Sequence, residues 1–156
     1  MATIDELKNL LSEDVRELDE LADLLSREKD LLGAADVRAL EEVTAQKNIL
    51  LEGIRSRAKQ KIRLLVNMGY KPDAGAPSRF IRASGQDELY QLWSTADSKL
   101  RFCQSVNENN GRILGHLQKR LGRITDIFRG ASSQQKLYGA KGQQTGVSNS
   151  TVLASA

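Results

Sequence analysis

Residues that could perform acid–base, nucleophilic or metal chemistry are few in this sequence and do not cluster. His116 is the only histidine and Cys103 the only cysteine. Zinc sites need several Cys or His side chains at close spacing, and carboxylate metal bundles use Glu-x-x-His motifs. Neither pattern occurs, and the chain has no P-loop and no GxGxxG motif. The sequence therefore predicts no enzyme, no bound metal and no cofactor.

The remaining candidates have structural interpretations. Adjacent acids such as Asp5–Glu6 and Glu41–Glu42 point in different directions on a helix, which is typical of solvated faces. His116 lies between apolar positions of a helix, and Cys103 lies on an apolar face, so both are predicted to be structural. A single cysteine excludes an intramolecular disulfide and fits a reducing compartment.

Apolar residues recur at steps of three and four over three long stretches, which predicts helices over about 3–31, 36–68 and 86–128. The first stretch has a broad apolar face rather than a narrow two-stranded seam. Gly33 suits the end of the first helix, Asp36 the start of the second, and Gly69 its end. The predicted fold is all-α: a long antiparallel hairpin plus a long third helix, an elongated, coiled-coil-like three-helix bundle over residues 1–129.

Charge supports the hairpin. Residues 1–32 carry ten acids and four bases, whereas residues 33–68 carry four acids and seven bases. In a hairpin with so short a turn, the numbers of facing residues sum to roughly 68. The acids between Glu13 and Glu20 then lie near the bases between Arg55 and Arg63, and these pairs favour one register.

Two segments interrupt the helical pattern. Residues 69–85 contain both prolines and three glycines, which predicts a linker that Phe80 and Ile81 pin to the bundle. The run from Asn107 to Gly111 interrupts the apolar face of the third helix. It is interpreted as a kink or a polar layer that fixes register, with a hinge as the alternative.

Helix lengths predict an unpartnered surface. At 1.5 Å per residue the second helix is roughly 50 Å long and the third roughly 64 Å, so the third outruns the hairpin near residue 119. The apolar stripe beyond that point is predicted to be an interaction site. Alternatively, the tail covers it or two copies associate through it. Residues 130–156 contain no acid and few apolar residues, which predicts a flexible, partner-binding tail.

The sequence also limits location and partners. It has no signal peptide and no apolar run long enough to span a membrane, so a cytoplasmic protein without stable membrane insertion is expected. A net charge of +3, spread along the chain, does not indicate a nucleic-acid surface.

Three sequence segments carry a family resemblance. They are LEEVTAQKNILLEGI (Leu40–Ile54), with its central lysine, VNENNGRIL (Val106–Leu114), and LYGAKGQ in the tail (Leu137–Gln143). With the order of hairpin, linker, long helix and tail, the chain resembles the FlgN family of bacterial flagellar type III export chaperones over nearly its whole length.

The resemblance implies a cytoplasmic chaperone that binds hook-associated flagellar proteins and prevents their premature assembly. It also implies delivery to the flagellar export apparatus, at the export gate or the export ATPase complex. The client-binding set is predicted to be Ile113, Leu114, Leu117, Leu121, Ile124 and Phe128. Leu137 and Tyr138 are the predicted docking residues of the tail. The alternative is a generic helical coiled-coil adaptor or scaffold without an export role.

Overall fold

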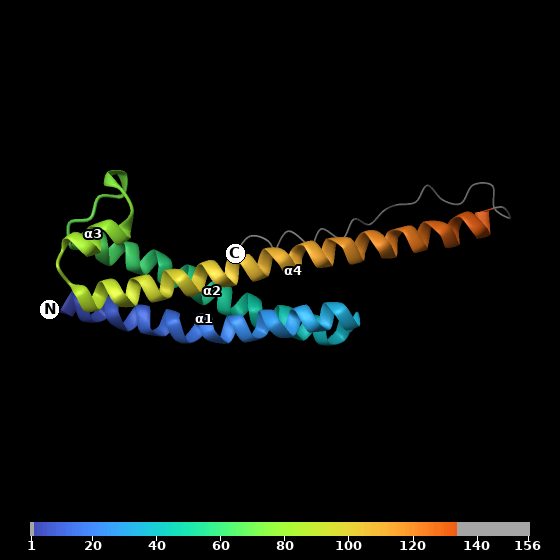
Figure 1. Cartoon of the computed structure of the whole chain (residues 1–156), viewed down its shortest axis with the longest axis horizontal. Helices are drawn as coiled ribbons and strands as arrows, with labels where there is room; N and C mark the ends of the chain where they lie inside the picture. Colours follow the sequence, from blue (N-terminus) through green and yellow to red (C-terminus); the bar gives the residue numbers. More distant parts are fainter. Residues whose placement is uncertain (1, 134–156) are drawn as a thin grey trace. The chain divides into compact units, whose positions relative to one another are not determined.

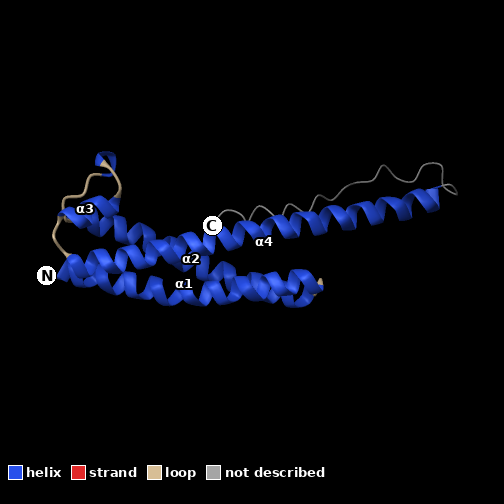
Figure 2. Cartoon of the chain, viewed as in Figure 1, coloured by secondary structure: helices blue, strands red, loops and turns tan. Residues whose placement is uncertain are grey.

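The computed structural model describes residues 2–133, and most of them are helical. The elements are α1 (Ala2–Ala34), α2 (Val37–Asn67), a short 3-10 helix η1 (Pro72–Ala74), α3 (Pro77–Ala83) and α4 (Asp87–Ser133). Figure 1 follows them along the chain, and Figure 2 shows only helices and loops in the described part. The predicted all-α fold is confirmed. The chain divides into two compact units, Met1–Val106 and Asn107–Ala156.

The turn between α1 and α2 differs in detail from the prediction. Gly33 lies inside α1, and the left-handed residue of the turn is Ala35, with φ +54°. Asp36 is the N-cap of α2 as predicted, because its carboxylate accepts a hydrogen bond of 3.2 Å from the Ala39 backbone N–H. The glycine signal was wrong because α1 continues for two residues after the last leucine of its apolar face.

Ala35→Gly is expected to raise the free energy of unfolding by about 1 kcal/mol. The left-handed conformation costs an L-residue about 1–2 kcal/mol, and glycine avoids this cost while losing more chain entropy on folding. Urea denaturation measures the change. Gly33→Ala is the companion variant: it should gain about 0.5–1 kcal/mol, because Gly33 is helical and has open space around it. A less stable Ala35→Gly variant would contradict a left-handed Ala35.

Within the broad apolar face of α1 lies a heptad seam. Its buried residues recur at alternating steps of four and three: Leu7, Leu11, Asp14, Leu18, Leu21, Leu25, Glu28 and Leu32. Two acids therefore occupy positions that a coiled coil normally gives to apolar side chains. The buried residues of α2 likewise include the bases Lys47 and Arg57 among Val43, Leu50, Leu51 and Leu65.

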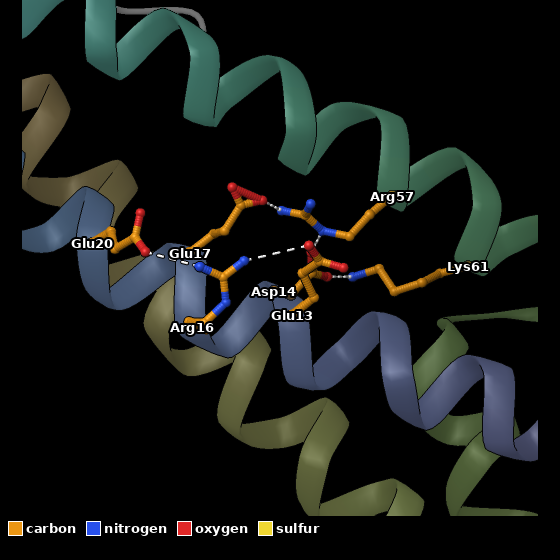
Figure 3. Close-up of polar contacts among 7 residues, drawn as sticks. All are labelled: Glu13, Asp14, Arg16, Glu17, Glu20, Arg57 and Lys61. Atoms are coloured by element: carbon orange, nitrogen blue, oxygen red, sulfur yellow. Dashed lines mark hydrogen bonds and ion pairs between the residues drawn. The ribbon is translucent and has the colours of Figure 1, made fainter.

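These buried charges form two ionic layers between α1 and α2. In the first, Asp14 pairs with Arg57 Nε at 2.6 Å and also with Lys61, while Glu17 pairs with the Arg57 guanidinium (Figure 3). In the second, the Lys47 ammonium lies 2.8 Å from Glu28 Oε2. Asp14, Glu28 and Lys47 are each at most 2% exposed. The predicted match of acids on the first helix with bases on the second is confirmed, but these pairs are buried.

The register of the hairpin differs from the predicted one. Asp14 contacts Arg57 and Lys61, so the numbers of the paired residues sum to 71 and 75 rather than 68. Part of the shift comes from the turn, which is centred between Ala35 and Asp36. The rest comes from side-chain direction: helical side chains lean toward the N-terminus of their helix, so the long side chain of Lys61 reaches back toward Asp14.

The segment after α2 is a folded corner rather than an open linker. α2 ends in a Schellman motif, in which the Tyr70 N–H donates to Leu65 O at 2.9 Å and the Gly69 N–H to Val66 O at 3.0 Å. Gly69, with φ +107°, takes the predicted C′ position. Ile81 is fully buried in the core and Phe80 packs against it, as predicted, but both belong to the helix α3.

The first part of α4, up to Val106, runs parallel to α1 in the first unit. Lys8 pairs with Glu88 at 3.0 Å and Asp19 with Lys99 at 2.7 Å, at a constant separation in sequence. The core here joins α1, the end of α2, α3 and the start of α4: Leu7, Leu11, Leu65, Tyr70, Ile81, Leu89 and Ala96. None of the helices within residues 2–133 has a stretch both long and apolar enough to cross a membrane.

Candidate functional site

The second unit begins at the polar run of α4. Asn107 and Asn110 are 3% and 1% exposed, and both make polar interactions. α4 continues without a break through this run to Ser133. Two buried amides in an unbroken helix fit the predicted polar layer rather than a kink. The alternative of a hinge stays a prediction.

The predicted client-binding residues lie on one face of α4. Ile113, Leu117, Leu121, Ile124 and Phe128 recur at steps of four and three, which aligns them along the helix, and Leu114 adjoins the stripe. Ile113, Leu114 and Leu117 are half-buried, whereas Leu121 is 54% exposed. For Ile124 and Phe128 the structure describes the backbone only.

Ile127 belongs to the same surface and was missing from the predicted set. Its side chain is 70% exposed, more than that of Leu121. At 100° per residue it falls at the edge of the stripe, close in direction to Ile124. Sequence could have identified Ile127 because it lies on the apolar face of the helix. It differs from the buried residues of that face only in its exposure. We define the α4 stripe as the predicted set together with Ile127.

Basic residues flank one edge of the α4 stripe. At 100° per residue, Arg120 projects between Ile113 and Ile127, Arg123 projects just beyond Ile127, and Arg112 and Lys119 lie further round the helix. All four are exposed. Arg112 approaches Glu108 at 4.0 Å, and Thr125 donates a hydrogen bond of 2.9 Å to Leu121 O on its own helix. An apolar stripe with one cationic flank is suited to binding an amphipathic segment in a fixed orientation.

The two candidate chemical groups, Cys103 and His116, differ in their exposure. Cys103 is buried, its Sγ lies 3.5 Å from Leu18 O, and burial raises the pKa of its thiol to about 11, with the nearby Asp19 adding to the shift. A thiol with so high a pKa stays protonated at neutral pH and is a poor nucleophile. His116 is exposed on α4. Within residues 2–133, no group of three or more His, Cys, Asp or Glu side chains is placed to hold a metal ion.

The predicted docking residues of the tail, Leu137 and Tyr138, lie outside the described residues. The prediction for them rests on the sequence alone.

Comparison with known proteins finds one family and one relative that match most of the chain. The family model described as FlgN protein matches residues 1–146. The flagella synthesis protein FlgN of Proteus mirabilis is 27% identical over 144 residues, which is 90% of each chain. No solved structure matches this chain.

Proposed function

Because this chain belongs to the FlgN family, we propose that it is a cytoplasmic export chaperone of the flagellum. It binds hook-associated flagellar proteins, prevents their premature assembly and delivers them to the export gate of the flagellar type III apparatus. The match to a flagella synthesis protein over 90% of both chains supports the flagellar role. The observation that carries the binding role is the α4 stripe, with Leu121 and Ile127 more than half exposed.

The stripe supports client capture by helix-in-groove recognition. A client segment with its own apolar face lies along α4 and removes Leu121 and Ile127 from water. Fully burying one such side chain contributes about 1.5–3 kcal/mol. A micromolar complex needs about 8 kcal/mol, and ordering a flexible client costs a further 2–5 kcal/mol. Two side chains do not supply this sum, so Ile113, Leu114, Leu117, Ile124 and Phe128 have to contribute.

The cationic flank of the stripe gives the client a preferred orientation. Arg120 and Arg123 beside Ile127 favour a client whose apolar face has acidic residues along one edge. Such exposed pairs contribute little free energy each, so they select orientation more than affinity. The tail is proposed as a second docking element, in which Leu137 and Tyr138 contact the client or the export apparatus.

Leu121→Asp combined with Ile127→Asp is expected to weaken binding of a purified hook-associated protein by at least about 100-fold. Each change removes an apolar contact and places a charge where the client would desolvate it. Isothermal titration calorimetry measures the affinity, and circular dichroism confirms that helicity is kept. Ile49→Asp is the matched control, because Ile49 is a 73% exposed isoleucine on α2 in the other unit.

The outcomes separate the family role from the site. If the double variant binds the client as tightly as the wild type, the α4 stripe is not the client site. If the wild type itself shows no affinity for hook-associated proteins, the proposed function is wrong. Removing residues 134–156 should preserve helicity while weakening binding to the client or to the export apparatus, and unchanged affinity for both would exclude a docking role for the tail.

A further inference from the structure

The corner between α2 and α3 contains a preformed hollow with aromatic walls. The rings of Tyr70 and Phe80 meet with centroids 5.5 Å apart at an interplanar angle of 57°. The Tyr70 hydroxyl donates a hydrogen bond of 2.7 Å to Gly75 O. This bond joins the two ends of the segment that contains η1. Tyr70 belongs to the core, and Phe80 packs against it. The aromatic walls are therefore held by the core of the first unit.

The hollow has the size of an anchor site for one or two side chains. Its volume is about 220 Å³, and alanines complete its apolar lining, Ala83 on α3 among them. Pockets for whole small molecules usually measure about 300–1,000 Å³, so this hollow is small for a cofactor. Neither ring forms an open stacking platform for a nucleic-acid base, because Tyr70 is buried and Phe80 is half-buried.

Two cations without acidic partners line the hollow. Lys71 and Arg79 are exposed lining residues, and no ion pair within residues 2–133 involves either of them. Arg82, the third base of this segment, lies over the Tyr90 ring at 5.8 Å. Asp73, the only acid in residues 69–85, is not among the lining residues. The rim of the hollow is therefore positively charged. By contrast, residues 1–32 of the same chain carry ten acids and four bases.

We propose that this corner docks an acidic protein segment that inserts one bulky apolar side chain into the hollow, against the walls formed by Tyr70 and Phe80. Its carboxylates pair with Lys71 and Arg79 at the rim. The chain's own tail does not fit this role, since residues 130–156 contain lysines and no acid. The acidic α1 of a second copy does not fit either, because its leucines are buried in the hairpin. The partner is therefore a different protein, and this docking surface lies in the first unit, apart from the α4 stripe.

Fluorescence anisotropy with defined peptides tests this proposal on the full-length chain. The probe is a fluorescein-labelled peptide with a central phenylalanine flanked by Asp and Glu. Comparison peptides carry Lys and Arg flanks, or alanine at the centre. The acidic peptide with the phenylalanine should bind at least about tenfold more tightly than either comparison peptide, and its affinity should fall as salt is raised.

Two variants test the hollow and its rim separately. Ala83→Leu fills the hollow from α3, at a position where leucine suits a helix. Lys71→Glu with Arg79→Glu reverses the rim charge on exposed side chains. Each of these two variants should bind the acidic peptide about tenfold or more weakly than the wild type does. The control, Lys29→Glu with Arg38→Glu, makes the same change in net charge on exposed residues near the opposite end of the hairpin and should not weaken binding.

Thermal unfolding by circular dichroism confirms that each variant is folded. Three results would overturn the proposal: equal affinity for acidic and basic peptides, unchanged affinity in the Ala83→Leu variant, or equal losses in the rim variant and its charge control. Tighter binding of a single-stranded oligonucleotide than of the acidic peptide would assign the positive rim to nucleic acid instead.

Discussion

Replacing Glu28 with alanine is expected to lower the free energy of unfolding by about 3–5 kcal/mol, as found when one partner of a buried ion pair is removed. Lys47 is 0% exposed, and its ammonium lies 2.8 Å from Glu28 Oε2. Without the carboxylate, the lysine must stay charged without its anion or lose its proton. Urea denaturation followed by circular dichroism measures the loss.

The double variant Glu28→Leu, Lys47→Met separates charge from packing. Replacing a whole buried ion pair with apolar side chains of similar volume is often neutral or stabilising. The double variant should therefore be at least as stable as the wild type to within about 1 kcal/mol. If it were destabilised as much as Glu28→Ala, packing rather than the unpaired charge would explain the loss.

The pH dependence of this pair has a defined sign. Burial lowers the pKa of Lys47 below its ordinary value of 10.5, and the hydrogen bond and charge of Glu28 offset only part of that shift. A base whose pKa is lower in the folded state destabilises the fold while it is protonated. The cost is relieved as pH rises through the folded pKa toward the unfolded one.

Glu28→Gln removes the charge that raises the pKa of Lys47. The rise in stability should therefore begin at a lower pH in this variant than in the wild type. Urea midpoints measured over about pH 7–10 test this. Parallel pH profiles for the two proteins would contradict a lysine whose protonation depends on Glu28.

The second large effect is expected at Asp14. Asp14→Ala should lower the free energy of unfolding by about 3 kcal/mol or more, because Arg57 and Lys61 both lose the buried carboxylate with which they pair. Burial alone would lower the pKa of Arg57, but its hydrogen bonds to Asp14 and Glu17 outweigh burial and raise that pKa. Arg57 stays charged when Asp14 is removed, because the ordinary pKa of an arginine lies far above neutral pH and Glu17 still pairs with its guanidinium. Chemical denaturation measures the change.

Glu13→Ala is the matched control for Asp14→Ala. Glu13 is the preceding residue, and its carboxylate pairs with Arg16 at 3.4 Å on the exposed side of α1. An exposed pair of this kind contributes less than about 1 kcal/mol. The two variants remove the same charge from the same helical turn, so similar losses would show that the burial of Asp14 is not the cause.

The long helices could be predicted from sequence because leucine spacing along α1, α2 and α4 is a local signal. The turn between α1 and α2 was predicted less well. The glycine rule selected Gly33, but Ala35 takes the left-handed conformation. Val37 has the spacing of the apolar face of α2, yet it is 65% exposed because it is the first residue of α2, beside the turn. The spacing of apolar residues does not show where along a helix the neighbouring helices stop covering its apolar face.

The pairing of charges in the ionic layers could be predicted from sequence, but their burial could not. Segment charges indicated that α1 and α2 attract each other, and the acids near Asp14 were matched with the correct group of bases. The burial was not predicted, because charged side chains are usually exposed, whereas the positions of Asp14, Glu28 and Lys47 along their helices place them in the core. For the α4 stripe, sequence found the apolar face, but the exposure of Ile127 depends on which neighbours pack against the helix.

The two ionic layers also restrict how the hairpin can change length during evolution. Asp14 and Glu28 are two heptads apart on α1, as are their partners Lys61 and Lys47 on α2. A deletion of one heptad from α1 alone would keep the leucines in phase but align a carboxylate with an apolar position of α2. Viable length variants should therefore have equal insertions or deletions in both helices, placed at the same distance from the turn. Homologous hairpins of different length would then keep acid and base paired across the seam.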